Sequence, residues 1–241
     1  MHPSFKYIVL FLLAALVVFI LIDTLRFYVL IRKGRVLAKN AIPFNRSVPH
    51  ASMTILVLGD STAVGTGSES AQLSTAGRMG TLYPGATIEN ISVNGLKLAG
   101  LLQILEKIGT IKHYDIILVQ IGANDIIRLT KKEDIKRDAE KVFAELSQHT
   151  NKLIVLHSGD VGEAKIFPLY ARFILSQKSF EMRDIYKNLS AKYNARYVDL
   201  INSPSRKLLR DNPSVYYAAD FLHLNGAGYG LWFDEIQKAL N

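Results

Sequence analysis

Two segments far apart in the chain contain the residue types that an acyl-transfer reaction requires. Ser61 supplies a hydroxyl early in the chain, and His223 supplies an imidazole near its end. A serine hydroxyl is a weak nucleophile until a base takes its proton, and histidine suits this task because its ordinary pKa lies near neutrality. Asp220 precedes His223 by three residues, so its carboxylate can hold the ring in the tautomer that faces the serine. Ser61, Asp220 and His223 are therefore predicted to be catalytic.

Two intervening segments contain groups that can stabilise negative charge. They are Asn94-Gly95 and Gly122-Ala123-Asn124-Asp125. The oxygen of an ester carbonyl becomes negative as the carbon turns tetrahedral, and N–H groups aimed at that oxygen stabilise it. The backbone N–H groups of Ser61 and Gly95 and the side-chain amide of Asn124 are predicted to form this oxyanion hole.

Each of these residues also has an ordinary structural explanation. A serine after a strand often caps a helix, and a histidine near a helix start can be a surface loop residue. Glycine and asparagine are common in turns. The catalytic interpretation therefore depends on the four segments occurring together.

The elements that must position these residues follow an alternating pattern. Short apolar runs rich in β-branched residues alternate with amphipathic stretches, which predicts a parallel sheet flanked by helices. Ligands of such sheets bind beyond the carboxyl ends of the strands, where the polar segments begin. The predicted strands are residues 54–58, 87–93, 116–121, 153–156 and 197–200. The predicted helices are residues 98–108, 177–193, 227–240 and one that opens with a capping box at Thr130 and Glu133 and buries Ile135, Ala139, Val142, Phe143 and Leu146.

The four polar segments resemble the sequence blocks of the SGNH/GDSL hydrolase family. These blocks begin with Gly-Asp-Ser, then a glycine, then Gly-x-Asn-Asp, then Asp-x-x-His, and this chain has them in that order. The resemblance extends from Met53 to about Leu240. It implies an α/β fold, namely a three-layer α/β/α flavodoxin-like domain with a five-stranded parallel sheet, and hydrolysis of esters without a metal or organic cofactor.

The resemblance also implies roles for individual residues. Leu224 stands where many members have proline, a position that shapes the loop without performing chemistry. The name-giving residues of the family correspond to Ser61, Gly95, Asn124 and His223, with Asp220 as the third member of the triad.

The residues after the fourth predicted strand are candidates for binding. His157 and Asp160 are expected to face the same edge of the sheet and to contact substrate. A metal site is not expected because no third ligand accompanies them. The following stretch, residues 166–175, is unusually apolar. It is consistent with a cover over an acyl pocket, with a contact to the bilayer, or with an ordinary helix packed on the core.

The N-terminal region has the composition of a membrane anchor. Residues 7–22 contain no charged side chain, and the apolar character resumes after Asp23. A cleaved signal peptide is the alternative, but no pair of small residues forms a cleavage site after Ile22. We predict an anchor with a basic flank over residues 1–35, a proline-containing linker over 36–52 and a hydrolase domain over 53–241.

The charge distribution excludes a nucleic-acid partner. Residues 1–50 contain seven Lys or Arg against one Asp, a net of +6, which leaves +2 of the total +8 for the rest of the chain. The cations therefore flank the apolar segment instead of covering the domain. The positive-inside rule favours a cytoplasmic domain, but the same cations could contact anionic headgroups, so the side of the membrane stays open. The chain has no cysteine, which excludes thiolate chemistry.

These observations predict a membrane-anchored serine ester hydrolase that acts through an acyl-serine intermediate. Its substrate would be a lipid, an acetylated glycan or a small acyl ester. Two alternatives stay open: an acyltransferase that uses the same site, and an inert membrane-tethered binding module. Nothing in the sequence indicates an oligomeric state.

Overall fold

A five-stranded parallel sheet forms the centre of the domain, in the computed structural model that describes residues 3–109 and 111–241. The strand order is β2-β1-β3-β4-β5, and all four pairings are parallel. The predicted sheet is confirmed. The strands are β1 (Met53–Gly59), β2 (Ala86–Asn90), β3 (Ile116–Gln120), β4 (Leu153–Leu156) and β5 (Arg196–Tyr197).

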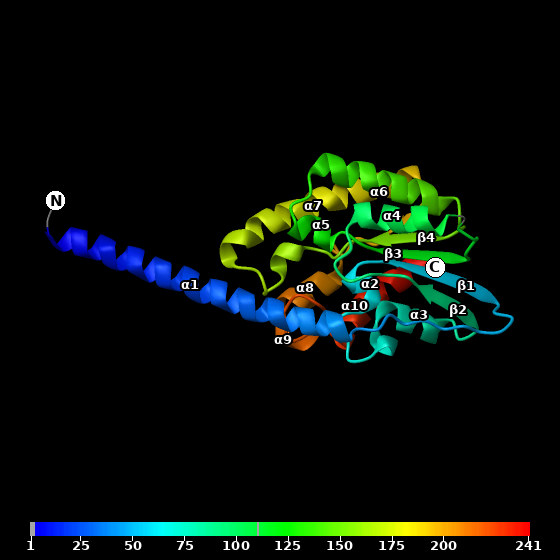
Figure 1. Cartoon of the computed structure of the whole chain (residues 1–241), viewed down its shortest axis with the longest axis horizontal. Helices are drawn as coiled ribbons and strands as arrows, with labels where there is room; N and C mark the ends of the chain where they lie inside the picture. Colours follow the sequence, from blue (N-terminus) through cyan, green and yellow to red (C-terminus); the bar gives the residue numbers. More distant parts are fainter. Residues whose placement is uncertain (1–2, 110) are drawn as a thin grey trace.

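Helices cover both faces of this sheet (Figure 1). Successive strand side chains point to opposite faces, so Leu56 and Leu58 join one hydrophobic core while Ile55 and Val57 join the other. The first core includes residues of α4 (Leu98–Ile108), α5 (Ala123–Ile127), α6 (Lys132–Ser147) and α7 (Leu169–Lys192). The second includes residues of α2 (Ser61–Val64), α3 (Thr75–Leu82), α8 (Pro204–Asp211), α9 (Pro213–Tyr216) and α10 (Gly226–Leu240). The predicted three-layer α/β/α architecture is therefore confirmed.

Helix α6 has the predicted buried face but a different start. Its apolar residues from Ile135 to Leu146 are buried. The predicted capping box is wrong, because Lys131 is the N-cap and makes no side-chain capping bond. Thr130 instead closes the turn after α5, where its N–H donates to the Asp125 carbonyl at 2.9 Å.

Other boundaries also differ from the sequence-based ones. Strand β5 ends at Tyr197 instead of residue 200. Strand β2 ends at Asn90 instead of residue 93, although the Ile91 N–H still donates to the Val57 carbonyl. Helix α7 begins at Leu169 instead of residue 177 and so includes most of the apolar stretch 166–175.

Helix α1 (Pro3–Asn40) is continuous, and its first half projects away from the domain (Figure 1). It is long and apolar enough to cross a membrane. The helix runs past the boundary that the sequence suggested at residue 35. The segment after it is fastened to the domain, because the Arg46 guanidinium donates to the carbonyl oxygens of Gly80, Tyr83 and Ala86.

The second half of α1 packs on the domain. The Asp23 carboxylate accepts a hydrogen bond from the Leu169 N–H at 3.3 Å, which satisfies a free N–H group at the start of α7. Arg26 pairs with Asp23 at 2.8 Å and donates to the carbonyl oxygens of Lys165 and Phe167 at 2.5 and 3.2 Å. Helix α1 is therefore joined to α7 by directional bonds as well as by apolar contacts.

Candidate active site

Ser61 is the first residue of α2, directly after β1. Asp60 caps this helix, and its carboxylate accepts hydrogen bonds from the Thr62 N–H and hydroxyl, both at 2.9 Å. Burial outweighs these bonds and raises the pKa of the Asp60 carboxyl. The tight turn between strand and helix leaves the Ser61 hydroxyl at the carboxyl edge of the sheet, 3.0 Å from Nε2 of His223.

The turn from Asp220 to His223 fixes the imidazole. Nδ1 of His223 donates to Oδ2 of Asp220 at 2.6 Å, while the other carboxylate oxygen accepts from the Leu222 and His223 N–H groups at 3.1 and 3.0 Å. Burial alone would raise the pKa of Asp220, but these bonds together hold it below its usual value. The turn requires a φ of +55° at Phe221, a strained conformation for a residue with a side chain.

Helix α1 closes over the Asp220 carboxylate. A methyl group built on Gly34 would lie 2.8 Å from Oδ2 of Asp220, so only glycine allows the helix to approach this closely. Asp220 is 0 % exposed. The N-terminal helix was predicted only as a membrane anchor, and Gly34 was not among the predicted site residues.

The residues of the predicted oxyanion hole share one cavity. Ser61, Gly95 and Asn124 all line one cavity of about 500 Å³, together with His223. Gly95 has a φ of +77°, which glycine adopts without strain. Its neighbour Asn94 accepts from the Thr66 hydroxyl at 2.6 Å and donates to a carbonyl oxygen of α1 at 2.9 Å. The loop that carries Gly95 is therefore held by α1.

One face of α1 forms a wall of this cavity. Ile31, Gly34, Arg35 and Ala38 have the i, i+3, i+4, i+7 spacing of a single helix face, and all four line the cavity. Arg128, which follows α5, lies on another wall. The remaining lining residues are Thr62, Asn94, Ala123, Ile127, Ser158, Asp160, Val161, Ala164, Ile166, Tyr217, Leu222, Leu224 and Trp232.

The two predicted binding residues occupy different environments. His157 is 2 % exposed, stacks on Tyr197 and does not line the cavity. Burial lowers its pKa to about 4. Asp160 does line the cavity, but its carboxylate bonds to Ser176 at 2.8 Å and to Arg206 at 3.0 Å. Asp160 therefore braces the loop after β4, and its charge is paired.

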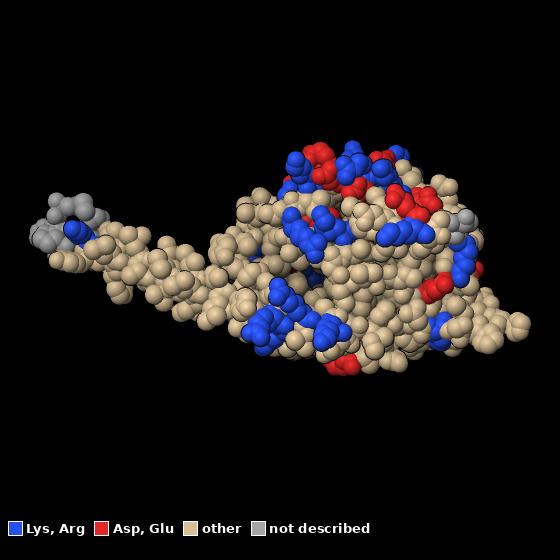
Figure 2. All heavy atoms as spheres, in the orientation of Figure 1, with Lys and Arg blue, Asp and Glu red and all other residues tan. Residues whose placement is uncertain are grey.

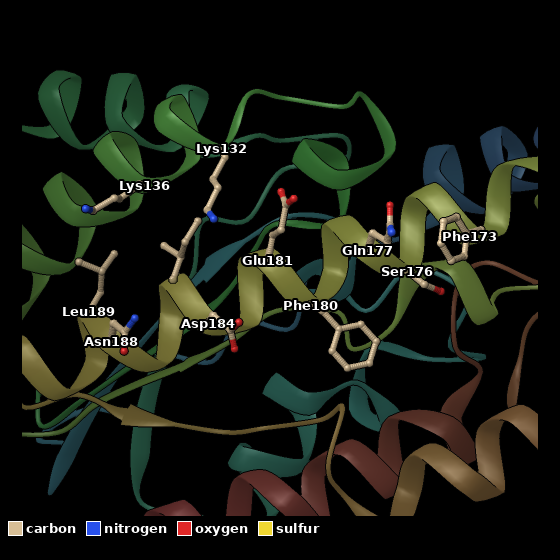
Figure 3. A pocket seen from close by; sticks show the side chains of 11 residues that line it. Lys132, Lys136, Phe173, Ser176, Gln177, Phe180, Glu181, Asp184, Asn188 and Leu189 are labelled. Atoms are coloured by element: carbon tan, nitrogen blue, oxygen red, sulfur yellow. The ribbon is translucent and has the colours of Figure 1, made fainter.

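A larger hollow of about 720 Å³ lies between α6 and α7 (Figure 3). It is lined by side chains of both charges, such as Lys132 and Glu181, and none of the predicted site residues borders it. Within residues 3–109 and 111–241, no group of three or more His, Asp or Glu side chains is arranged to hold a metal ion.

The comparison with known families agrees with this geometry. Residues 57–231 match the model of the GDSL-like lipase/acylhydrolase family. The chain belongs to this family. It is an ester-hydrolysing enzyme of the SGNH type, as the four sequence blocks predicted.

Solved structures share the fold of this GDSL-like hydrolase. A lipolytic protein of the G-D-S-L family from Veillonella parvula aligns with a TM-score of 0.62 at 16 % identity, covering 78 % of this chain and 97 % of that one. An acetylxylan esterase from Geobacillus stearothermophilus gives 0.60 at 16 % identity, with 79 % and 95 % covered. A lipase/acylhydrolase from Enterococcus faecalis gives 0.59 at 20 % identity, with 78 % and 95 % covered. No curated protein matches the sequence.

Proposed function

We propose that this GDSL-like hydrolase cleaves its ester through an acyl-serine intermediate, with Ser61 as nucleophile, His223 as base and Asp220 as the group that orients His223. The observation that carries the proposal is the unbroken hydrogen-bond chain from the Ser61 hydroxyl through the imidazole to Asp220, with contacts of 3.0 and 2.6 Å. This chain allows a proton to leave the hydroxyl as the serine attacks.

The reaction then proceeds in two halves. The Ser61 oxygen forms a bond to the carbonyl carbon, Nε2 of His223 takes the hydroxyl proton, and the ester bond breaks as the same proton passes to the leaving alcohol. Water attacks the acyl-serine with His223 again as base, which releases the acid and restores the serine. In both halves the Ser61 and Gly95 N–H groups and the Asn124 amide stabilise the oxyanion.

Labelling with a fluorophosphonate probe tests the nucleophile. The wild-type chain is expected to form a covalent adduct, and Ser61→Ala is expected to form none. Ser158→Ala is the matched control, because Ser158 lines the same cavity but has no hydrogen bond to an imidazole. Labelling that persists in Ser61→Ala, or that disappears only in Ser158→Ala, would assign the nucleophile elsewhere.

The substrate classes that fit are lipids, acetylated glycans and small acyl esters. A hydrolysis assay with and without added alcohols distinguishes a hydrolase from an acyltransferase, because transfer produces a new ester where hydrolysis releases the free acid. An inert binding module would neither label nor turn over.

We also infer that α1 holds the enzyme at a membrane. The apolar first half of α1 projects from the domain, and Figure 2 shows no acidic side chain on the drawn face of this part. The second half belongs to the domain through Asp23, Arg26 and Gly34, which favours a retained helix over a cleaved signal sequence. The test is whether the mature chain keeps residues 1–22 and stays with membranes after an alkaline carbonate wash.

A further inference from the structure

We propose that the active-site cavity takes an ester whose substituent carries an anionic group, a phosphate or a carboxylate, bound by Arg35 and Arg128. This inference rests on the proposed function, since it assigns a substrate class to the same site. It starts from two cations that line the cavity of Ser61 and His223 and come from elements far apart in the sequence.

Neither arginine is neutralised within the protein. The ion pairs among residues 3–109 and 111–241 involve neither Arg35 nor Arg128. Asp160 is the one carboxylate that lines the cavity within these ranges, and Arg206 pairs with it at 3.0 Å. Arg206 is itself outside the lining. The cavity wall therefore carries two uncompensated positive charges.

Both arginines, although exposed, come from backbone close to the reaction centre. Gly34 touches the Asp220 carboxylate and Ala38 accepts a hydrogen bond from Asn94, so Arg35 lies on a helix face fixed at both ends. A methyl group built on Gly95 would lie 3.5 Å from a guanidinium nitrogen of Arg128, which places this cation beside a proposed oxyanion donor. An anionic group bound there would sit next to the ester that Ser61 attacks.

The chemistry of the guanidinium group favours this class of ligand. Arginine presents planar N–H groups that match two oxygens of a carboxylate or phosphate, and such charge-assisted bonds are stronger than neutral ones. A neutral acetylated sugar would leave both cations without a partner, whereas an anionic ester would neutralise them. An anionic lipid, which reaches the site along α1, and a water-soluble anionic ester share this chemistry.

The test compares hexanoyl esters whose alcohol part is either neutral or anionic. The probes are 1-hexanoyl-glycerol, 1-hexanoyl-glycerol 3-phosphate and the hexanoyl ester of glycolate, which separate neutral, phosphate and carboxylate ligands. Binding to full-length Ser61→Ala protein in a neutral detergent is measured by calorimetry, and turnover is measured with the wild type. We expect at least one anionic ester to bind about tenfold or more tightly than the neutral one.

Variants of the two arginines test whether Arg35 and Arg128 cause this preference for anionic esters. In Arg35→Gln and Arg128→Gln the ratio of anionic to neutral affinity should fall about tenfold each, and Arg→Lys at either position should restore part of it. Arg32→Gln is the matched control, because Arg32 is exposed on the same helix outside the cavity. Equal binding of charged and neutral esters, or an unchanged ratio in both Gln variants, overturns the inference. Absent turnover with a retained binding preference would instead overturn the catalytic proposal alone.

An independent observation assigns a second membrane contact, at the start of α7. Leu169, Tyr170 and Phe173 are 59 %, 63 % and 70 % exposed, an unusual state for neighbouring large apolar side chains. The Leu169 N–H donates to Asp23, the residue that directly follows the uncharged segment 7–22. The apolar side chains of α7 therefore lie where α1 would leave the bilayer.

The length of the uncharged segment of α1 also supports a contact between the start of α7 and lipid. Residues 7–22 span roughly 24 Å as a helix, several ångströms less than the roughly 30 Å of bilayer hydrocarbon. The exposed apolar side chains at the start of α7 lie beside the end of this segment and would extend its apolar surface across this difference. We infer that the first turns of α7 dip into the lipid headgroup layer.

Quenching by brominated phospholipids tests this contact in vesicles that contain the full chain. The fluorescence of Phe173→Trp, or of Leu169→Trp if the first variant does not fold, should be quenched more strongly than that of the natural Trp232 in the unmodified chain. Phe180→Trp is the control, because Phe180 lies two turns further along α7 beneath Arg206 and should not be quenched. Phe19→Trp is the positive control, because Phe19 lies in the uncharged segment that we propose enters the bilayer. Quenching at Phe19 without quenching at the start of α7 overturns the contact, and quenching at neither site overturns the membrane helix as well.

Discussion

At the scale of single residues, the geometry of the proposed triad depends on the groups that hold the serine and the imidazole. Asp60 caps the helix that begins with Ser61, and the strained Phe221 directs the chain so that two N–H groups and the imidazole all reach Asp220. Strain of this kind persists only where surrounding contacts enforce it. The hydroxyl and the ring are therefore positioned before substrate binds.

Asn124 gives a prediction about the transition state. Asn124→Ala is expected to lower kcat roughly a hundredfold with a small change in KM, because the amide donates to an oxygen that is fully negative only in the transition state. Steady-state kinetics with a soluble ester measure both constants. Asn188→Ala, at an exposed position on α7, is the control. An unchanged kcat in Asn124→Ala would remove the amide from the oxyanion hole.

His157 gives a prediction about stability. Its pKa is lowered to about 4 from an ordinary 6.5, so the folded protein keeps it neutral while the unfolded chain takes up a proton as pH falls through this window. The free energy of unfolding should therefore fall by about 3 kcal/mol between pH 6.5 and 4 through this residue alone. Urea unfolding of His157→Phe should show a pH dependence smaller by this amount. Equal pH dependence in both proteins would mean that His157 is protonated in the fold.

Sequence patterns predicted which residues the fold brings into one hydrogen-bonded chain better than which residues line the cavity around that chain. The proximity of Ser61, Asp220 and His223 could be predicted because the proposed triad restricts both the residue types and their local spacing. His157 follows a strand as a substrate-binding residue would, yet its ring packs on Tyr197 in the interior. A strand end specifies an edge of the sheet, and only packing decides whether a side chain there turns toward the cavity or the core.

At the scale of elements, the periodic segments were predicted, but the contribution of α1 to the cavity wall was not. Helix α4 has the bounds that its pattern indicated, because one apolar face and one polar face make an unambiguous signal. The second half of α1 was assigned to an anchor with a basic flank and to a linker, so no face of it was expected to pack on the domain. Gly34 was the one local hint, since glycine in a helix interior is unfavourable without a packing reason.

Gly34→Ala tests the contact between α1 and Asp220. The added methyl group meets Oδ2 of Asp220 at 2.8 Å, so the carboxylate or the helix must shift and the His223 ring loses its alignment. We expect kcat to fall about tenfold or more, a loss of at least about 1.4 kcal/mol of transition-state stabilisation. Alanine favours a helix over glycine, so the loss would not come from unfolding of α1.

The control for this prediction is Val36→Ala, which alters an exposed side chain on the same helix. Thermal unfolding of the two variants should give similar midpoints. A Gly34→Ala enzyme with full activity would show that α1 approaches Asp220 without constraining it.

At the scale of the whole molecule, α1 connects two environments. Its first half is apolar and projects from the domain, while its second half seals Asp220, holds the loop of Gly95 through Asn94 and adds Arg35 to the cavity. In Figure 2, Lys and Arg side chains gather where this helix reaches the domain. One continuous helix therefore carries both the apolar segment that we propose enters a membrane and part of the wall of the candidate active site.

Two truncations separate these functions. Deletion of residues 1–22 removes most of the projecting apolar helix but keeps Asp23, Arg26 and Gly34, so the protein should leave the membrane fraction and still hydrolyse a soluble ester. Deletion of residues 1–40 exposes Asp220 to water and frees Asn94, so turnover should fall about a hundredfold or more, because the oriented carboxylate and one oxyanion donor are both disturbed. Circular dichroism establishes that both truncated proteins are folded. Equal activity in the two folded proteins would show that the domain completes its active site without α1, and loss of activity in both would show that catalysis requires the apolar half as well.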